Sequence, residues 1–173
     1  GGNADAQYRL GQYYSTGPAL NPKKASEFLQ AAAQQGHVAA TSQLSDVYLR
    51  GLGVEKDYEK AIELCRRVAE QNVEAKTRLG LCYLFGWGTK VDPALAQNLL
   101  LQAAQAGEKV AMYYTSRIYR KGWGGKKDPI AALDWLKKAA AQGLKEAQYD
   151  LALAYAAGEV EPEGKQKAVD LLL

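Results

Sequence analysis

Few residues of this chain could bind a metal or carry out acid–base chemistry. The sequence contains one histidine, His37, and two cysteines, Cys65 and Cys82. A zinc site needs several converging nitrogen or sulfur ligands, and a nucleophilic triad needs a base that is oriented by a third group. No motif around His37 supplies such partners. We therefore expect no catalytic residue, no metal site and no cofactor.

Two further features have the residue types of ligand-binding sites. Trp87 and Trp123 could form an aromatic platform for a sugar or a peptide, and packing within a loop explains them equally well. The glycine- and lysine-rich stretch at residues 122–127 contains the residue types that cradle phosphate, but its spacing fits no P-loop. Neither feature predicts a specific reaction.

The composition is that of an ordinary folded protein. Of the 173 residues, 47% are hydrophobic and 24% are charged, which argues against disorder, collagen-like repeats and a disulfide-rich miniprotein. The net charge of +3 is too small to indicate nucleic-acid binding. No apolar run approaches the roughly 20 residues that span a bilayer. We expect neither nucleic-acid binding nor membrane insertion.

An internal repeat organises the whole chain. The pattern A-x-x-x-L-G-x-x-Y-x-x-G occurs from Ala6 and again from Ala75, with looser copies from Ala40, Ala111 and Ala147. The alanine recurs at steps of 34, 35, 36 and 36 residues. A second set recurs in phase with the first, at Ala25, Ala61, Ala96, Ala132 and Ala168. A period of this length is typical of repeat architectures.

Each copy reads as two helices. In the first part, apolar residues at i, i+4 and i+8 share one helical face, and Gly86 suits a left-handed cap that ends the helix. The second part opens with an N-cap residue, as in Asp128-Pro129, where proline fits the first helical position. We expect the second helices to end at residues that tolerate the left-handed conformation, namely Gly36, Asn72, Gly107 and Gly143.

One such unit cannot bury its apolar face alone, so neighbouring units must stack. The predicted fold is all-α, a right-handed α/α superhelical solenoid of about five helix-turn-helix repeats. The single array covers residues 1–173, with repeats at about 3–36, 37–72, 73–107, 108–143 and a partial one at 144–173. Leu171, Leu172 and Leu173 match the middle of a second helix, so we expect the chain to be a fragment of a longer array.

The period, the first-helix pattern, the G-x-G loop and the K-A-A-x-x-G ending resemble the Sel-one-like repeat, a relative of the tetratricopeptide repeat. The resemblance implies an adaptor that holds other proteins or peptides. It also favours a periplasmic or cell-envelope location, because many bacterial members work in the envelope, in secretion or in exopolysaccharide export. Two departures are the missing G-x-G in the first copy and Thr115-Ser116 in place of Leu-Gly in the fourth, which implies a locally altered helix contact.

The two cysteines occupy positions that are apolar in the other copies. Cys65 matches Leu29, Leu100 and Leu136, and Cys82 matches Val47 and Ile118 among others. Buried free thiols are the predicted state, since free cysteine packs as a small hydrophobic residue. Both cysteines lie at comparable distances from the turn at Asn72-Val73, so a disulfide between them remains a geometric alternative.

The candidate binding site comes from first-helix positions that do not recur between copies. Three positions at i, i+3 and i+7 share a face, which we expect to be concave. In the third copy they hold Arg78, Leu81 and Phe85, and in the fourth Tyr114, Arg117 and Lys121. An apolar centre with a basic rim has the composition of a binding hot spot. Packing of Leu81 and Phe85 beneath the neighbouring repeat is the alternative.

The predicted function is a non-enzymatic scaffold or adaptor for protein–protein interaction, which binds a peptide or protein segment on its concave face. Over all five copies the stripe carries five basic and two acidic residues, which favours an acidic segment with one or two apolar anchors. The alternative function is a bacterial envelope protein associated with exopolysaccharide export or glycan binding, whose partner would be an anionic polysaccharide.

Overall fold

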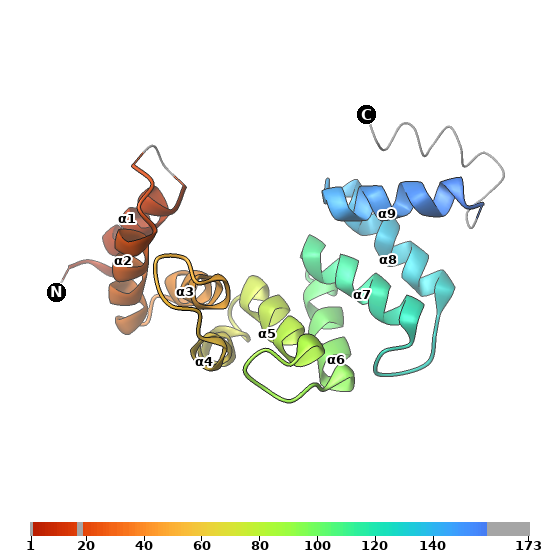
Figure 1. Cartoon of the computed structure of the whole chain (residues 1–173), viewed down its shortest axis with the longest axis horizontal. Helices are drawn as coiled ribbons and strands as arrows, with labels where there is room; N and C mark the ends of the chain where they lie inside the picture. The colour runs from red at the N-terminus through yellow and green to blue at the C-terminus, as the bar shows by residue number, and fades with distance from the viewer. Residues whose placement is uncertain (1, 17–18, 159–173) are drawn as a thin grey trace. The chain divides into compact units, whose positions relative to one another are not determined.

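The computed structural model describes residues 2–16 and 19–158, which form nine α-helices and no strand (Figure 1). The helices are α1 (Ala4–Thr16), α2 (Pro22–Gln34), α3 (Val38–Arg50), α4 (Tyr58–Val68), α5 (Val73–Phe85), α6 (Pro93–Gln105), α7 (Lys109–Lys121), α8 (Pro129–Ala141) and α9 (Lys145–Ala156). The predicted all-α repeat solenoid is confirmed, and the right-handed sense of its superhelix stays a prediction. The leucines at 171–173 and the glycine-proline pair at 17–18 lie outside the described residues.

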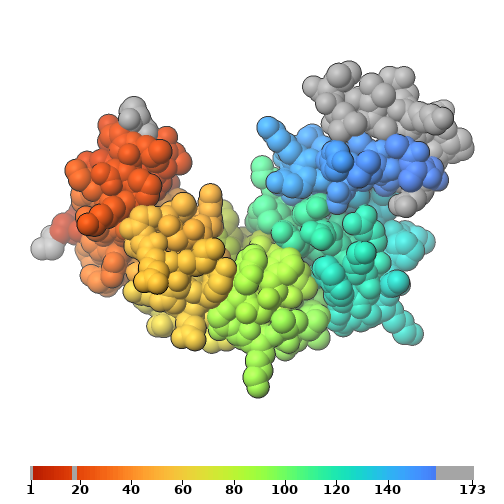
Figure 2. Space-filling view, in the orientation of Figure 1, coloured from red at the N-terminus to blue at the C-terminus, as the bar shows by residue number. Residues whose placement is uncertain are grey.

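The chain forms two compact units, Gly1–Asp92 with α1 to α5 and Pro93–Leu173 with α6 to α9. Within each unit, consecutive helices pack on one another. In the first unit the core joins α2, α3 and α4 through Leu29, Ala32, Leu44, Val47 and Leu64, all buried. The space-filling view shows the first repeat, red and orange, in direct contact with the yellow second repeat (Figure 2).

Side-chain caps start the helices where the sequence predicts them. The carboxylate or amide oxygens of Asn21, Asp57 and Asp128 accept hydrogen bonds from the backbone N–H three residues later. These bonds satisfy amide groups that have no partner inside the helix. Asn72 was predicted to end a helix in the left-handed conformation, and this is wrong. Its φ is −140°, and its side chain caps the start of α5 by accepting from the N–H of Ala75.

Small residues allow the helices of a repeat to approach closely. A Cβ at Gly11 would lie 2.8 Å from Cγ of Leu29, so α1 and α2 cross at van der Waals contact only because this position is glycine. In the fourth repeat, Thr115 and Ser116 replace Leu-Gly and are both buried. Ser116 donates to the carbonyl of Tyr113, whereas Oγ1 of Thr115 has no hydrogen-bond partner within the described part of the chain.

The second glycine of each G-x-G loop touches the preceding repeat. Gly53, Gly88 and Gly124 all have positive φ angles, between 68° and 81°. A Cβ on any of them would overlap backbone atoms at the start of the second helix of the preceding repeat, at Pro22, Tyr58 and Pro93 respectively. The loop therefore packs one repeat on the next, and this packing depends on the absence of a side chain.

Candidate peptide-binding pocket

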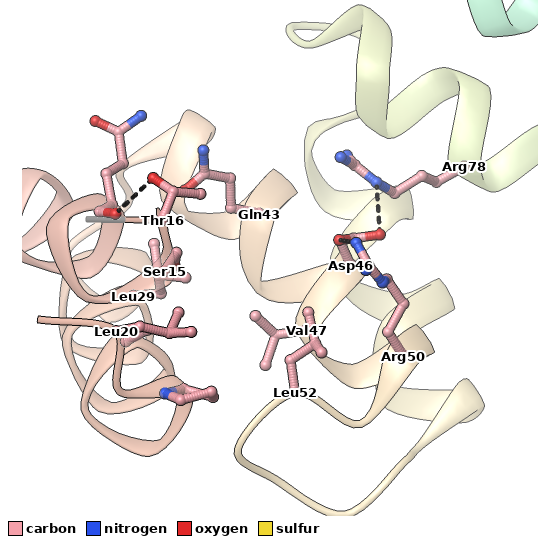
Figure 3. Close-up of a pocket in the computed structure, with 13 residues that line it drawn as sticks. Ser15, Thr16, Leu20, Leu29, Gln43, Asp46, Val47, Arg50, Leu52 and Arg78 are labelled. Atoms are coloured by element: carbon pink, nitrogen blue, oxygen red, sulfur yellow. Dashed lines mark hydrogen bonds and ion pairs between the residues drawn. The ribbon is translucent and has the colours of Figure 1, made fainter. Parts of the chain in front are cut away.

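A pocket of about 610 Å³ opens on the first unit, between the first and second repeats (Figure 3). Helices α1 and α3 form most of its wall, α2 contributes its floor, and α5 supplies one side chain. Its lining consists of Gln12, Ser15, Thr16, Leu20, Pro22, Ala25, Leu29, Gln43, Asp46, Val47, Arg50, Leu52 and Arg78.

One part of the pocket is aliphatic. Leu29 and Val47 belong to the buried core, with 1% and 6% of their surface exposed. Leu20 and Leu52, by contrast, come from the loops after α1 and α3 and are 64% and 37% exposed. Figure 3 shows Leu20 pointing across the pocket toward Val47 and Leu52. An aliphatic side chain placed between them would remove apolar surface from water.

The other part is charged. Asp46 lies between two arginines, with Oδ2 at 3.3 Å from Nη1 of Arg50 and Oδ1 at 3.8 Å from Nε of Arg78 (Figure 3). Nη1 of Arg78 also donates to Oγ of Ser42 at 2.8 Å, and that hydroxyl donates to Oδ1 of Asn72. Two guanidinium groups and one carboxylate give this part of the pocket a charge of +1.

Three of the six predicted site residues lie on α5 in the first unit, namely Arg78, Leu81 and Phe85. Arg78 lines the pocket, with 23% of its side chain exposed. Leu81 is half-buried and lies outside the lining. Phe85 is 39% exposed, and its ring packs against Trp87 at a centroid distance of 5.0 Å. Trp87 in turn stacks on Tyr58, so loop packing accounts for this tryptophan.

The other three predicted residues belong to α7, in the second unit. Tyr114 and Arg117 are half-buried and Lys121 is exposed. The Arg117 guanidinium lies 5.8 Å from the ring centroids of both Tyr113 and Tyr114. Tyr113 donates to Asp150 at 3.0 Å, and burial, followed by this carboxylate, raises the pKa of the phenol. Arg117 therefore packs against two aromatic side chains of its own helix.

Of the six predicted site residues, Arg78 alone lines the pocket. Gln12, Thr16, Gln43, Asp46 and Arg50 occupy five of the six equivalent positions in the first two repeats and also line it, although they were not assigned to the predicted site. The apolar residues beside them were absent from the predicted site, because Leu29 and Val47 follow the core pattern and Leu20 and Leu52 lie in loops. The pocket is centred on these two repeats, while the site at Leu81 and Phe85 stays a prediction.

The model of the Sel1 repeat family matches five successive segments, residues 4–37, 38–73, 73–108, 109–144 and 145–173. The chain belongs to the Sel1 repeat family. The resemblance noted from the repeated motifs is thereby confirmed. Sel1 repeat proteins are generally adaptors in protein–protein interactions, and their scaffold is generally non-catalytic.

This Sel1 repeat chain is similar to solved structures over nearly its whole length. A Sel1 repeat protein from Oxalobacter formigenes is 30% identical with a TM-score of 0.89, and the match covers 98% of this chain and 70% of that one. A protective antigen present in uropathogenic Escherichia coli strains, which displays an SLR fold, is 31% identical with a TM-score of 0.77. That match covers 98% of this chain and 37% of the antigen.

Among curated proteins, a chitin synthase regulator of Saccharomyces cerevisiae is 33% identical over 130 residues. The match covers 69% of this chain and 19% of the regulator. An uncharacterized protein of Neisseria meningitidis serogroup B is 52% identical over 56 residues, which are 32% of this chain and 12% of that protein. The Sel1 repeat chain thus spans about a fifth or less of the length of these relatives.

Within residues 2–16 and 19–158 of the Sel1 repeat chain, no cluster of three or more His, Cys, Asp or Glu side chains suited to a metal ion occurs. No helix in the same ranges is long and apolar enough to cross a membrane. Cys65 and Cys82 are both buried, as predicted, and are free thiols.

His37 has a structural role at the junction of the first two Sel1 repeats. Its Nδ1 accepts a hydrogen bond from the N–H of Ala40 at 3.1 Å and so caps α3. Its Nε2 lies 3.1 Å from Oδ1 of Asp5, and its ring packs on Tyr8 at 4.5 Å. The single histidine therefore joins α1 to the start of α3.

The His37→Ala variant is expected to lose about 1 kcal/mol of unfolding free energy, the usual effect of deleting an N-cap acceptor. His37→Asn should recover most of that loss, because asparagine is a strong N-cap residue. Urea denaturation followed by circular dichroism measures both. Equal losses in the two variants would show that the contacts with Asp5 and Tyr8, rather than the cap, stabilise this junction.

Proposed function

We propose that this Sel1 repeat chain is a non-enzymatic adaptor that binds a peptide or protein segment on the first-helix face of its first unit. The observation that carries the proposal is the pocket between the first and second repeats, where an aliphatic floor meets a polar wall. Mostly apolar pockets with a few placed polar groups are the usual form of binding sites.

The sequence of the wall supports a ligand-binding role. A core position recurs in every repeat because every repeat must pack on the next, whereas Gln12 and Asp46 hold one shared helical position with different side chains, and Thr16 and Arg50 hold another. Leu81 and Phe85 continue this face of α5, and we propose that they extend the binding surface. Tyr114, Arg117 and Lys121 form the corresponding proposed set in the second unit.

The chemistry of the pocket supports binding rather than catalysis. Its two hydroxyl side chains donate to backbone carbonyls of their own helix, Ser15 to Gly11 at 2.8 Å and Thr16 to Gln12 at 3.3 Å. Activation of a hydroxyl nucleophile needs an adjacent general base within hydrogen-bond reach. The one carboxylate of the lining, that of Asp46, is engaged with Arg50 and Arg78.

Filling the pocket from its exposed wall tests the proposal. A random dodecapeptide library displayed on phage is selected against the immobilised chain, and the enriched peptides are measured by fluorescence polarisation. Gln12→Trp should weaken binding by about tenfold or more, because a large side chain on the wall occupies the ligand's space. Gln30→Trp is the matched control, since Gln30 is an exposed residue of α2 outside the lining.

The melting temperatures of both variants should match that of the parent chain, because both substitutions are on exposed positions. Enriched peptides that bind all three proteins equally would refute a site in this pocket. A selection that enriches no peptide would refute peptide binding by the chain.

A further inference from the structure

We infer that the segment bound in this pocket presents an acidic side chain, Asp or Glu, next to a large aliphatic residue. In the chain without ligand, Asp46 holds Arg50 and Arg78 in position for that acidic side chain. The inference rests on the proposed function and specifies its ligand. It follows from how the charged groups of the pocket are paired.

Asp46 pairs incompletely with its neighbours. One carboxylate serves two guanidinium groups, through a single contact of 3.3 Å to Arg50 and a longer one of 3.8 Å to Arg78. A guanidinium binds a carboxylate best through two parallel N–H donors, and neither contact has that form. The Arg50 side chain is 63% exposed, and its hydrogen bond to Asp46 uses Nη1 alone. Its remaining donors can receive a second carboxylate.

Arg78 is also held in a position from which it can bind the ligand's carboxylate. Its side chain is 23% exposed, and Nη1 is fixed by the hydroxyl and the carbonyl of Ser42 at 2.8 and 3.3 Å. Ser42 is buried and is itself bonded to Asn72. A cation fixed in advance loses little side-chain entropy when a ligand binds. The net charge of +1 makes an anionic group the complementary one and disfavours a basic segment.

The aliphatic part of the pocket is the reason to expect a large aliphatic residue in the ligand. Leu20 and Leu52 keep much of their surface in water, although Leu20 points across the pocket toward Leu52 and the buried Val47. A leucine, isoleucine or valine beside the acidic residue would cover them. Burial of a full aliphatic side chain strengthens binding by about tenfold or more, enough to discriminate such a segment from a purely acidic one.

The carboxylate comes from a side chain rather than from the end of a chain. Recognition of C-terminal carboxylates typically uses a concave array of free backbone N–H groups. Most of the wall belongs to α1, α3 and α5, where Gln12, Asp46 and Arg78 lie beyond the first turn and have helical N–H groups. The cationic donors are therefore the side chains of Arg50 and Arg78.

The test uses the peptides enriched from the dodecapeptide library, synthesised with acetylated and amidated ends. We expect Asp or Glu within three positions of Leu, Ile or Val in the enriched set. Replacing that acid by Asn or Gln should weaken binding about tenfold, as should Arg50→Gln. Arg67→Gln, on an exposed arginine of α4 outside the lining, is the control and should change nothing.

The Asp46→Asn variant tests whether the Asp46 carboxylate competes with the ligand's acidic side chain for the two arginines or only supports the structure of the pocket. Removing this charge changes the local charge from +1 to +2, so acidic peptides should bind about threefold or more tightly, and the gain should shrink as salt is added. A free C-terminal carboxylate in place of the amide should leave the affinity unchanged.

Failure of this inference and failure of the proposed function give different results. Two results would overturn the acidic ligand and leave the binding pocket in place. In the first, the peptides bind Gln12→Trp more weakly but bind Arg50→Gln as tightly as the parent chain. In the second, the peptides keep their affinity when their acidic residue is replaced. Tighter binding by the free C-terminal acid would assign the carboxylate to a chain end. Weaker binding of the acidic peptides to Asp46→Asn would overturn the inference that Asp46 competes with the ligand for the two arginines. No enrichment, or no response to Gln12→Trp, would overturn both proposals.

Discussion

Gly88→Ala is expected to destabilise the chain by about 3 kcal/mol or more. Two penalties combine at this position. The φ of Gly88 is 68°, a conformation that costs an alanine about 1–2 kcal/mol. The new Cβ would also overlap the backbone of Tyr58 and Glu59, which begin α4 in the preceding repeat. Backbone atoms cannot move aside as a flexible side chain can, so the loop must lift off the second repeat.

Gly36→Ala is the matched control for this prediction. Gly36 has a φ of 82°, and a Cβ there would meet no atom within 4 Å. This variant therefore carries the backbone penalty without the clash, and its expected loss is about 1–2 kcal/mol. Urea titration of both variants gives the two free energies of unfolding. Equal losses would show that the contact between the loop and α4 contributes nothing to stability.

Cys82 is expected to react with a thiol reagent about a thousandfold more slowly in the folded chain than in the unfolded one. The thiolate is the reactive form, and burial raises the pKa of Cys82 from 9.0 to about 12, with a smaller contribution from nearby Cys65. Three pKa units reduce the thiolate fraction at pH 8 by roughly a thousandfold. Burial also raises the pKa of Cys65, against the opposing hydrogen bond to Ser45.

The measurement is a titration of thiols with Ellman's reagent at pH 8, without reductant, before and after adding denaturant. The expected result is no fast-reacting thiol in the folded chain and two after unfolding. A fast thiol in the native state would contradict the burial of these side chains. No thiol after unfolding would establish the disulfide alternative.

The same pKa shift makes stability depend on pH in the alkaline range. The folded-state pKa of Cys82 lies above its unfolded value, so this thiol's contribution is complete below about pH 9 and is lost as the pH rises toward 12. Unfolding free energies measured between pH 8 and 11 should therefore fall less steeply in Cys82→Ala than in the parent chain. Equal slopes of unfolding free energy against pH in the two proteins would show that other groups account for the loss of stability at alkaline pH.

The repeats and their helices were predictable from sequence because both depend on local chemistry. A helix closes its hydrogen bonds over four residues, and its caps act within three, so residues such as Asp57 and Asp128 mark its start without reference to the rest of the chain. A solenoid adds contacts only between neighbouring repeats, which is why a period of about 35 residues implied the architecture. Asn72 was assigned to the wrong helix end because asparagine serves both as an N-cap and as a left-handed residue.

The pocket required the tertiary structure. Its wall joins Gln12, Asp46 and Arg78, which belong to three different repeats, and its aliphatic part joins core residues to the loop residues Leu20 and Leu52. Which of these side chains converge depends on the rotation of each helix pair relative to the next, and the spacing of residues along one chain does not contain that rotation. The same holds for Gly88, whose loop position is visible in the sequence while its contact with the backbone of Tyr58 is not. Sequence periodicity determined which helices form and which faces they bury, and the packing between repeats decided where an exposed apolar surface meets an incompletely paired charge.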